Sequence, residues 1–270
     1  MTSPSEAYEA FYRDFDSPVM RRIRREAYGE DIGQHSWVRA DELRGDVRRL
    51  ALSNSSRLLD IGCGPCGPLT FTLASTGCQG TGVDLSPAAL RNGRRRAESL
   101  GVDARLSVLE ADLNRPLPFP SRSFDAAISF DVVLHLRDRA KLFSEVARLL
   151  RPGGRFLFTD AGVLTGSISN DEVRKRGVRG YIQLVPPGWN ERLLESAGFR
   201  VMETDNRTRS VLENAQGRLS AMDTYRAELE QLSSAASGLA GERDYLEAVV
   251  ELSRREALSR IMYLVEARPR

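Results

Sequence analysis

The stretch LLDIGCGPCG, residues 58–67, decides the fold of this 270-residue chain. Its apolar start is typical of a buried strand, and the pattern that follows it is typical of a helix. Glycines let the backbone turn tightly and approach a ligand, while the first turn of a helix offers free amide groups. The stretch therefore predicts a strand, a ligand-binding turn and a helix, in that order.

Similar apolar runs recur along the chain and alternate with helical patterns. Strands are expected at 57–61, 80–84, 105–110, 124–130 and 155–160. Strands joined by helix-length crossovers pair in parallel, because each connection must cross one face of the sheet. Pro116, Pro118 and Pro120 exclude a regular helix from the third crossover, since proline lacks an amide donor, and a loop over the sheet edge is expected there. The stretch Pro152-Gly153-Gly154 is expected to end one helix and open the fifth strand.

The segments outside these five units predict two additions to the sheet. A helix is expected at 190–197, strands at 199–205 and 259–266, and two helices over 209–255 with a break near 233–241. Aromatic residues are dense before the first strand, which favours either a lid over a ligand or a cover over the sheet edge. We therefore expect an α/β fold with a doubly wound, mostly parallel, seven-stranded Rossmann-like sheet, an N-terminal helical lid and a helical insertion before the last strand. The expected division is a lid at 1–52, a core at 53–208 and 257–270, and a cap at 209–256.

The net charge and the cysteine content limit the classes of substrate and site that the chain can have. The 39 basic and 37 acidic residues give a net charge of +2, which supplies no broad field for nucleic acid or an anionic membrane. A small, roughly neutral substrate is therefore expected. Without an apolar run of about 18 residues, and with charges throughout its first stretch, the chain is expected to have neither a membrane span nor a secretory signal and to be cytoplasmic. Three cysteines are too few for a disulfide scaffold or a four-cysteine zinc site, and no metal is expected.

Two acids distinguish the possible ligands of the glycine turn. Gly62, Gly64 and Gly67 match the G-x-G-x-x-G spacing of dinucleotide-binding proteins, so an NAD-dependent oxidoreductase is one interpretation. Asp60 stands at the end of the first strand, where an anion does not help a pyrophosphate but favours an ammonium group. Asp84 ends the second strand and is placed to accept hydrogen bonds from both hydroxyls of a ribose. Together they predict a nucleoside that carries an amino acid.

In these motifs and their order, the chain resembles the class I S-adenosylmethionine-dependent methyltransferases over about residues 50–205. Asp112-Leu113 resembles the adenine-binding position of the family, Ser123-Phe124-Asp125 leads into the fourth strand, and LLRPGG at 149–154 resembles the stretch before the fifth. The resemblance implies S-adenosylmethionine as the cofactor and S-adenosylhomocysteine as its product. The implied cofactor site comprises Asp60, Gly62, Cys63, Gly64, Asp84, Leu85, Asp112, Leu113, Phe130 and Trp37.

Two further features resemble small-molecule members of that family. Residues 12–37 resemble the cofactor lid of natural-product sugar O-methyltransferases and of sarcosine or dimethylglycine N-methyltransferases, with Trp37 placed either for cation–π contact with the sulfonium or for packing on the sheet. A histidine and an aspartate after the fourth and fifth strands resemble the catalytic pair of the sugar enzymes, which implies catalytic roles for His135 and Asp160. A packing role for His135 and an acceptor-orienting role for Asp160 stay open. Base-assisted O-methylation of a natural-product acceptor is expected, with N- and C-methylation as alternatives.

Cys66 departs from the family pattern, because it occupies the position of the third glycine, two residues after Gly64. Cys63-Gly64-Pro65-Cys66 also spells the C-G-P-C motif of redox proteins, and thiols at the start of a helix acquire lowered pKa values. A redox enzyme would leave Asp60 and Asp84 unexplained, so the milder hypothesis is that oxidation blocks cofactor binding. A non-catalytic module that keeps the nucleoside pocket is the remaining alternative.

Overall fold

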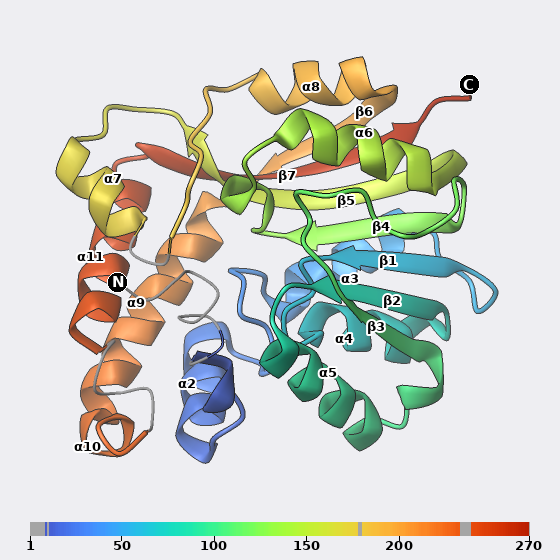
Figure 1. Cartoon of the computed structure of the whole chain (residues 1–270). Helices are drawn as coiled ribbons and strands as arrows, with labels where there is room; N and C mark the ends of the chain where they lie inside the picture. The colour runs from blue at the N-terminus through green and yellow to red at the C-terminus, as the bar shows by residue number, and fades with distance from the viewer. Residues whose placement is uncertain (1–8, 10, 178–179, 233–238, 270) are drawn as a thin grey trace.

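The computed structural model describes residues 9, 11–177, 180–232 and 239–269, and its centre is a seven-stranded sheet (Figure 1). The strands are β1 (Arg57–Ile61), β2 (Gln79–Asp84), β3 (Leu106–Glu110), β4 (Phe124–Phe130), β5 (Leu150–Leu164), β6 (Phe199–Asn206) and β7 (Leu258–Ala267). Their order across the sheet is β3-β2-β1-β4-β5-β7-β6. Strands β1 to β5 pair in parallel, whereas β7 runs antiparallel between β5 and β6. The carboxyl ends of the five parallel strands therefore share one edge.

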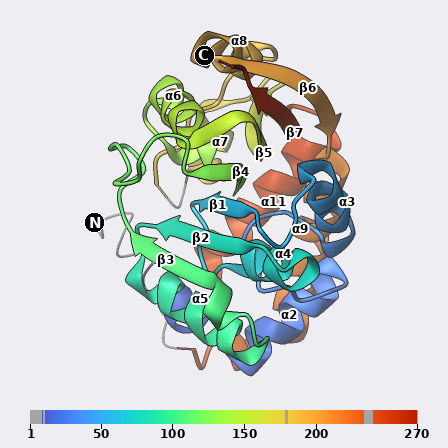
Figure 2. The ribbon, with the colours of Figure 1, turned by 90° about the vertical axis from the view of Figure 1, so that its right-hand side faces the viewer.

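Helices cover both faces of the sheet, as the alternation of side chains along the strands requires. Phe156 and Phe158 of β5 pack with α6 (Arg139–Leu149) and α8 (Trp189–Ala197) in one buried cluster. Leu157, between them, belongs to the cluster on the opposite face. That cluster includes α3 (Ala40–Leu50), α4 (Gly67–Thr76) and α5 (Pro87–Ser99). Figure 2 shows these two helical layers with the sheet between them.

The remaining helices gather beyond the carboxyl ends of the parallel strands (Figure 1, left). They are α2 (Pro18–Tyr28), α7 (Asn170–Arg176), α9 (Thr208–Thr224), α10 (Arg226–Leu229) and α11 (Leu239–Arg254). Apolar residues of α2, α9 and α11 form a third buried cluster, which also contains Trp37 and Ala161 of β5. The N-terminal segment and the insertion before β7 thus meet at the edge of the sheet where ligands of open α/β folds bind.

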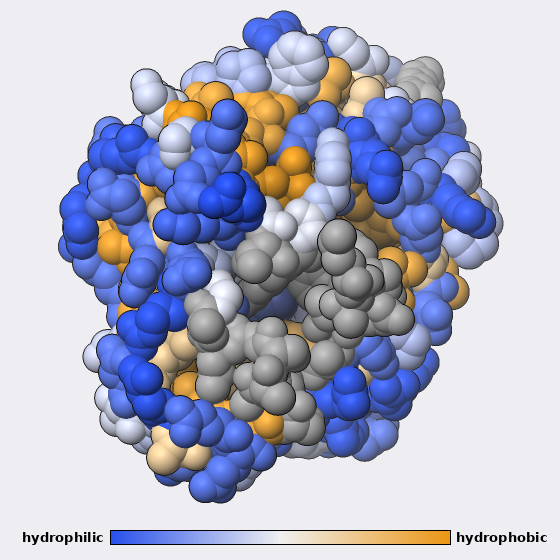
Figure 3. Space-filling model, turned by 60° about the vertical axis from the view of Figure 1, so that its left-hand side comes forward, coloured by the Kyte–Doolittle hydropathy of each residue, from blue (hydrophilic) through white to orange (hydrophobic). Residues whose placement is uncertain are grey.

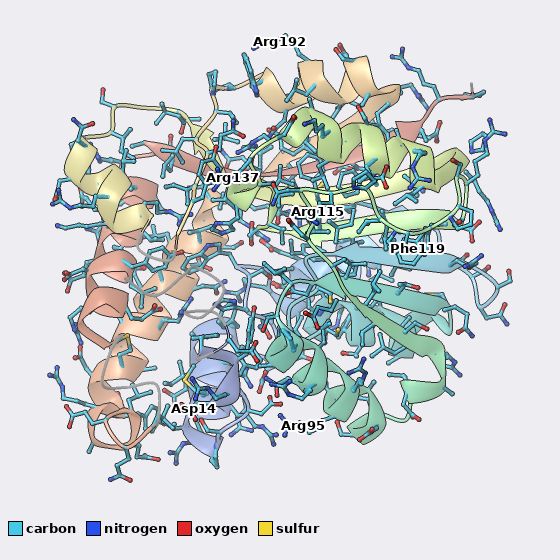
Figure 4. The ribbon with its side chains drawn as sticks, in the orientation of Figure 1. Asp14, Arg95, Arg115, Phe119, Arg137 and Arg192 are labelled. Carbon is cyan, nitrogen blue, oxygen red and sulfur yellow. The ribbon has the colours of Figure 1, made fainter. Side chains whose placement is uncertain are left out.

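The expected Rossmann-like sheet with its helical insertion is confirmed, and so is the third crossover, where residues 111–123 form no helix. Arg115 and Phe119, labelled in Figure 4, belong to this crossover loop. The expected start of the fifth strand is wrong. Helix α6 ends at Leu149 and β5 begins at Leu150, because Leu150 already pairs with Phe124 ahead of the Pro-Gly-Gly turn.

The insertion also differs from expectation, because it holds three helices in its described part rather than two. The chain turns at Tyr225, between α9 and α10, and α11 begins inside the region where a break was expected. Part of that break, 233–238, lies outside the described residues. Helix α7, which follows β5, was not expected at all.

The face of the molecule that carries the cap helices is mostly hydrophilic, with a smaller apolar area in its upper half (Figure 3). Among the described residues, no helix combines the length and the apolar character needed to cross a bilayer.

Candidate active site

The glycine turn after β1 holds the conformation that its sequence requires. The amides of Gly62 and Cys63 both donate to the carbonyl oxygen of Val83, at the end of β2. Gly62 has a φ of +71°, and a Cβ there would lie 2.5 Å from the side chain of Val132. Only glycine fits this position without strain. Cys66 takes the left-handed conformation as well, with a φ of +56°, immediately before α4.

Asp60 lies beneath this turn as a buried acid without a cation. Its residue is 2% exposed, and Oδ2 has no hydrogen-bond partner among the described residues. Burial raises the pKa of the Asp60 carboxyl well above its usual range, and the nearby Asp84 raises it further. A buried carboxylate is stabilised by an opposite charge or by hydrogen bonds, and no described residue supplies either to Oδ2 of Asp60. A ligand ammonium group would supply both.

Asp84 connects the turn to the end of β2. Its carboxylate accepts hydrogen bonds from the amides of Gly64 at 2.8 Å and Ser86 at 2.9 Å. Burial raises the pKa of Asp84, although these bonds to the carboxylate oppose the shift. The two aspartates lie close enough for the charge of Asp84 to raise the pKa of Asp60.

The other predicted cofactor residues lie along the same edge of the sheet. Leu85 follows β2 and is half exposed. The amide of Ala111 donates to the carbonyl of Asp84, which brings the loop with Asp112 and Leu113 beside it. Phe130, the last residue of β4, is buried in the core. These positions fit an elongated nucleoside, but their contact with one stays a prediction.

The N-terminal segment covers the glycine turn. A Cβ at Gly64 would lie 3.0 Å from the hydroxyl of Tyr12, which is itself 3.0 Å from Nδ1 of His35. The carbonyl of Tyr12 accepts a hydrogen bond from Asn92 of α5. The carboxylate of Glu9 accepts hydrogen bonds from the Ser86 hydroxyl and the Ala88 amide, at the start of α5. The segment is thus fastened beside Asp84.

Trp37 contributes its backbone and its ring to different neighbours. Its amide donates to Oδ2 of Asp131 at 2.9 Å. Its ring stacks on Tyr245 of α11 with 6.3 Å between ring centroids, and the guanidinium of Arg218 lies 5.4 Å from its centre. The described contacts of the ring therefore join the N-terminal segment to the cap. Contact with a sulfonium stays a prediction.

The cysteines of the C-G-P-C stretch are close together but shielded. Sγ of Cys66 lies 3.5 Å from Sγ of Cys63, and both residues are buried as free thiols. Burial raises the pKa of the Cys63 thiol well above its usual range. Redox-active thiols have lowered pKa values and some exposure, so this geometry does not favour disulfide chemistry as the main function.

Asp131, directly after β4, is neutralised by an arginine from β7. Nε of Arg260 donates to Oδ1 of Asp131 at 2.9 Å, and the hydroxyl of Thr159 donates to the same oxygen at 2.8 Å. Arg260 also pairs with Glu42 of α3. Asp131 has a φ of +60°, a strained value for a residue with a side chain. The ion pair therefore holds both the end of β4 and the backbone of Trp37.

The predicted catalytic role of Asp160 does not fit its surroundings. The residue is 0% exposed, and its carboxylate forms an ion pair with Arg139 of α6. It also accepts hydrogen bonds from the side-chain amide of Asn190 and the backbone amide of Gly162. A fully buried acid that is already bound to three donors is shielded from an acceptor molecule. We therefore leave Asp160 out of the proposed catalytic set.

His135 retains a geometry suited to a base. It lies in the short 3₁₀ helix η2 (Val133–His135), after β4, and is partly exposed. Its Nδ1 lies 3.0 Å from the carbonyl oxygen of Tyr181. Because a carbonyl oxygen can only accept, Nδ1 carries the hydrogen in this bond, and in the neutral ring Nε2 is then the basic nitrogen. Arg137, two residues on, lies at the same end of the sheet (Figure 4).

Sequence analysis did not single out Arg139 and Arg260, the arginines that pair with Asp160 and Asp131. In a chain with 39 basic residues, Arg139 resembles the many exposed arginines on helices. Arg260 carried one signal, since it stands inside the apolar run expected to form the last strand. A charge in a buried strand requires a partner, but the sequence did not indicate which one.

Comparison with known proteins places the glycine turn inside a shared region. Residues 59–158 match a family model described as "Methyltransferase domain". Methyltransferase GfsG of Streptomyces halstedii is 33% identical over 161 residues, which are 57% of this chain and 56% of that protein. The glycine/sarcosine/dimethylglycine N-methyltransferase of Actinopolyspora halophila is 27% identical over 214 residues, 74% of this chain and 37% of that protein. The chain thus spans about half the length of such relatives.

Solved structures share the fold over the whole chain. Phosphoethanolamine N-methyltransferase 2 of Haemonchus contortus, in complex with S-adenosyl-L-methionine, has a TM-score of 0.79 at 23% identity and covers 100% of this chain and 61% of its own. The cyclopropane synthase MmaA2 of Mycobacterium tuberculosis has a TM-score of 0.80 at 17% identity, with 98% and 99% covered. At such identities the likeness concerns the fold.

Proposed function

The chain belongs to the class I S-adenosylmethionine-dependent methyltransferases, and we propose that it transfers the methyl group of this cofactor to a small organic acceptor. The observation that carries the proposal is the buried, unpartnered carboxylate of Asp60 beside Asp84 at the glycine turn. Both acids lie within the segment that matches the methyltransferase family, residues 59–158. An NAD-dependent enzyme would place a pyrophosphate beside this anion, which electrostatics disfavours.

The residues present fit the cofactor at each of its ends. Asp60 would face the ammonium group, Asp84 would accept hydrogen bonds from the ribose hydroxyls, and the loop with Asp112 and Leu113 would border the adenine. The backbone of Gly62 and Gly64 would lie along the amino-acid part. When bound, the cofactor supplies a methyl group already activated on a sulfonium. The protein has to position the acceptor and remove its proton.

We assign proton removal to Nε2 of His135, the nitrogen opposite the one that contacts Tyr181. A positioned base typically accelerates such a step by about 10²- to 10⁴-fold. Alignment of the acceptor with the methyl group, at about 3 to 3.5 Å, contributes the larger share. A base is needed for a hydroxyl acceptor at neutral pH, so we propose O-methylation. Relatives include enzymes named for C-, N- and O-methylation, which makes the acceptor atom the part to be tested.

We also propose that the acceptor is a small natural product or metabolite handled in the cytoplasm. The near balance of 39 basic and 37 acidic residues supports a small molecule rather than nucleic acid or a membrane surface. We propose that residues 1–52 act as the cofactor lid, with 209–256 as the cap over the acceptor, because the two segments pack together at the ligand-binding edge.

Calorimetry on the reduced protein tests cofactor choice directly. Titrations with S-adenosylmethionine and S-adenosylhomocysteine are expected to give saturable heat, whereas NAD is expected to give none. Binding of NAD without binding of either methionine nucleoside would overturn the assignment.

The variant His135→Ala tests the proposed base. Turnover, followed as S-adenosylhomocysteine formed, is expected to fall by about 10²- to 10⁴-fold while the Kd of S-adenosylhomocysteine stays within about twofold. Arg192→Ala, at an exposed position of α8, is the control and is expected to leave both quantities unchanged. Equal turnover of His135→Ala and the wild type would show that His135 only packs locally.

A further inference from the structure

One buried arginine of this protein differs from all the others in the described residues. Six arginines are less than a tenth exposed: Arg24, Arg139, Arg176, Arg207, Arg218 and Arg260. Five of them form ion pairs with aspartate or glutamate. Arg176, which is 5% exposed, has no carboxylate within ion-pair distance in this part of the chain. Buried charges are normally paired, because removing an ion from water costs several kcal/mol.

Within the part of the chain that the structure describes, the contacts of Arg176 are all with neutral groups. Arg176 is the last residue of α7, and its Nη1 donates to the hydroxyl of Tyr245 at 3.1 Å. Its Nη2 lies 3.4 Å from the carbonyl oxygen of Ala161, which follows Asp160 on β5. The guanidinium lies 5.2 Å from the centre of the Tyr245 ring. These contacts hold the side chain in place without neutralising it.

Arg176 borders a small, partly open cavity near the carboxyl end of β5. The cavity lies between the ends of β5 and β7 and the helices α9 and α11, and its lining includes Val211, Val249, Ser253 and Ser259. Arg260 lines it too, but that charge is neutralised by Asp131 and Glu42. The volume is about 10 Å³, room for about one water molecule, so a larger group enters only if the cap moves.

The cavity is connected to the proposed site through two residues already described. Arg260 binds Asp131, which directly follows β4 and accepts a hydrogen bond from the amide of Trp37. Tyr245, which binds Arg176, stacks on the ring of Trp37. These contacts join the surroundings of Arg176 to the carboxyl end of β4, from which the turn with His135 starts.

We propose that Arg176 is an acceptor-binding residue that pairs with a carboxylate of the methyl acceptor. This inference rests on the proposed methyltransferase function and names its substrate class, a small carboxylic acid. Arginine suits this role because its planar fork binds both oxygens of a carboxylate at once. The apolar lining around the guanidinium strengthens the pairing, since little water competes for it. The hydroxyls of Ser253 and Ser259 add donors of the kind that a carboxylate accepts.

The test compares acids with their uncharged amides on protein saturated with S-adenosylhomocysteine. The probes are 4-hydroxybenzoate with 4-hydroxybenzamide, and lactate with lactamide, titrated by calorimetry. The wild type is expected to bind at least one acid tenfold or more tightly than its amide, because hydrogen bonds to charged groups exceed those to neutral ones. Equal affinity for acid and amide, or no binding of either acid, would overturn the inference.

Variants of Arg176 and one matched control test whether the preference for the acid depends on Arg176. Arg176→Gln is expected to abolish the preference for the acid, and Arg176→Lys to retain part of it, because lysine keeps the charge but not the fork. Arg192→Gln, which removes the same charge from the exposed residue labelled in Figure 4, is expected to keep the full preference. An unchanged acid preference in Arg176→Gln would contradict the proposal.

Binding of S-adenosylhomocysteine distinguishes failure of the methyltransferase proposal from failure of the proposed role of Arg176. If the wild type does not bind S-adenosylhomocysteine, the methyltransferase proposal itself is overturned. Normal binding of S-adenosylhomocysteine without an acid preference would overturn only the role of Arg176.

Discussion

The aspartates in two halves of the same sheet edge have opposite electrostatic surroundings. At the ends of β1 and β2, Asp60 and Asp84 lie close together without a cation, and burial raises both pKa values. Directly after β4 and within β5, Asp131 and Asp160 each form an ion pair with a buried arginine. All four acids lie in or directly after a parallel strand, toward its carboxyl end. Position alone therefore does not tell a binding acid from a structural one.

This difference indicates that a buried acid without a paired cation locates the place where a ligand binds. Arg260 and Arg139 neutralise their acids within the protein and fix the backbone around them. Asp60 and Asp84 receive only backbone amides or nothing, so their ionised forms are costly until a cation arrives. On the other half of the edge the sign of the charge is reversed. There Arg176 is the buried cation for which the described residues provide no carboxylate. Each half of the edge thus contains an unbalanced charge where a ligand is proposed.

The largest expected effect comes from breaking a structural pair. Arg139→Met should lower the free energy of unfolding by about 3 to 5 kcal/mol, because Asp160 would be left buried without a cation. Arg115→Met, at an exposed position, should change it by less than about 0.5 kcal/mol. Urea denaturation at neutral pH measures both. Similar small losses in the two variants would show that Asp160 is not held by Arg139.

On the cofactor side, Asp84→Ala should weaken binding of S-adenosylhomocysteine by about 10- to 100-fold, since hydrogen bonds to a charged group are each worth about 1.5 to 3 kcal/mol. Asp103→Ala, in the exposed helix η1 (Asp103–Arg105), should leave the Kd unchanged. Calorimetry on both variants is the measurement. A Kd unaffected by Asp84→Ala would place the ribose elsewhere.

Asp60→Asn should have opposite effects on stability and on cofactor binding. Because burial raises the pKa of Asp60, the folded state holds this proton more tightly than the unfolded state. The ligand-free protein therefore loses stability as pH rises from the ordinary aspartate pKa, about 3.9, toward the raised value. Asp60→Asn removes that loss and should therefore raise the ligand-free unfolding free energy at pH 7. Its affinity for the cofactor should fall.

Asp131→Asn is the matched contrast to that variant. It removes the charge that neutralises Arg260, so the unfolding free energy at pH 7 should fall rather than rise. Thermal denaturation of the two variants side by side measures the signs. Destabilisation by both substitutions would mean that Asp60 already has a stabilising partner in the folded protein.

The smallest expected effect is the release of a fraction of a proton when the cofactor binds. An ammonium group placed beside Asp60 lowers the raised pKa of the Asp60–Asp84 pair, so binding should release a fraction of a proton between the bound and free pKa values. Calorimetry in two buffers of different ionisation enthalpy measures this release. Proton uptake instead of release would contradict the assignment of Asp60.

The cofactor side of the site could be predicted because its information is local. Asp60 and the glycines are neighbours in sequence, and parallel pairing alone brings Asp84 beside them. The acceptor side depends on partners far apart in the chain, such as Arg260 and Asp131, which are separated by 129 residues. No periodicity specifies which of many arginines turns inward. The sequence therefore indicated a catalytic or acceptor-orienting role for Asp160, but it gave no sign of the ion pair that this residue forms with Arg139.

The order of strands in the sheet has a consequence for how the molecule is assembled. Strand β6 pairs only with β7, and β7 lies between β5 and β6 although it is made last of the seven. Residues 199–206 thus have no neighbour to pair with until residues 258–267 have left the ribosome. Because such distant pairing closes a long loop and is slow, the completed sheet should form only once β7 has been made, with the β1–β5 half already folded.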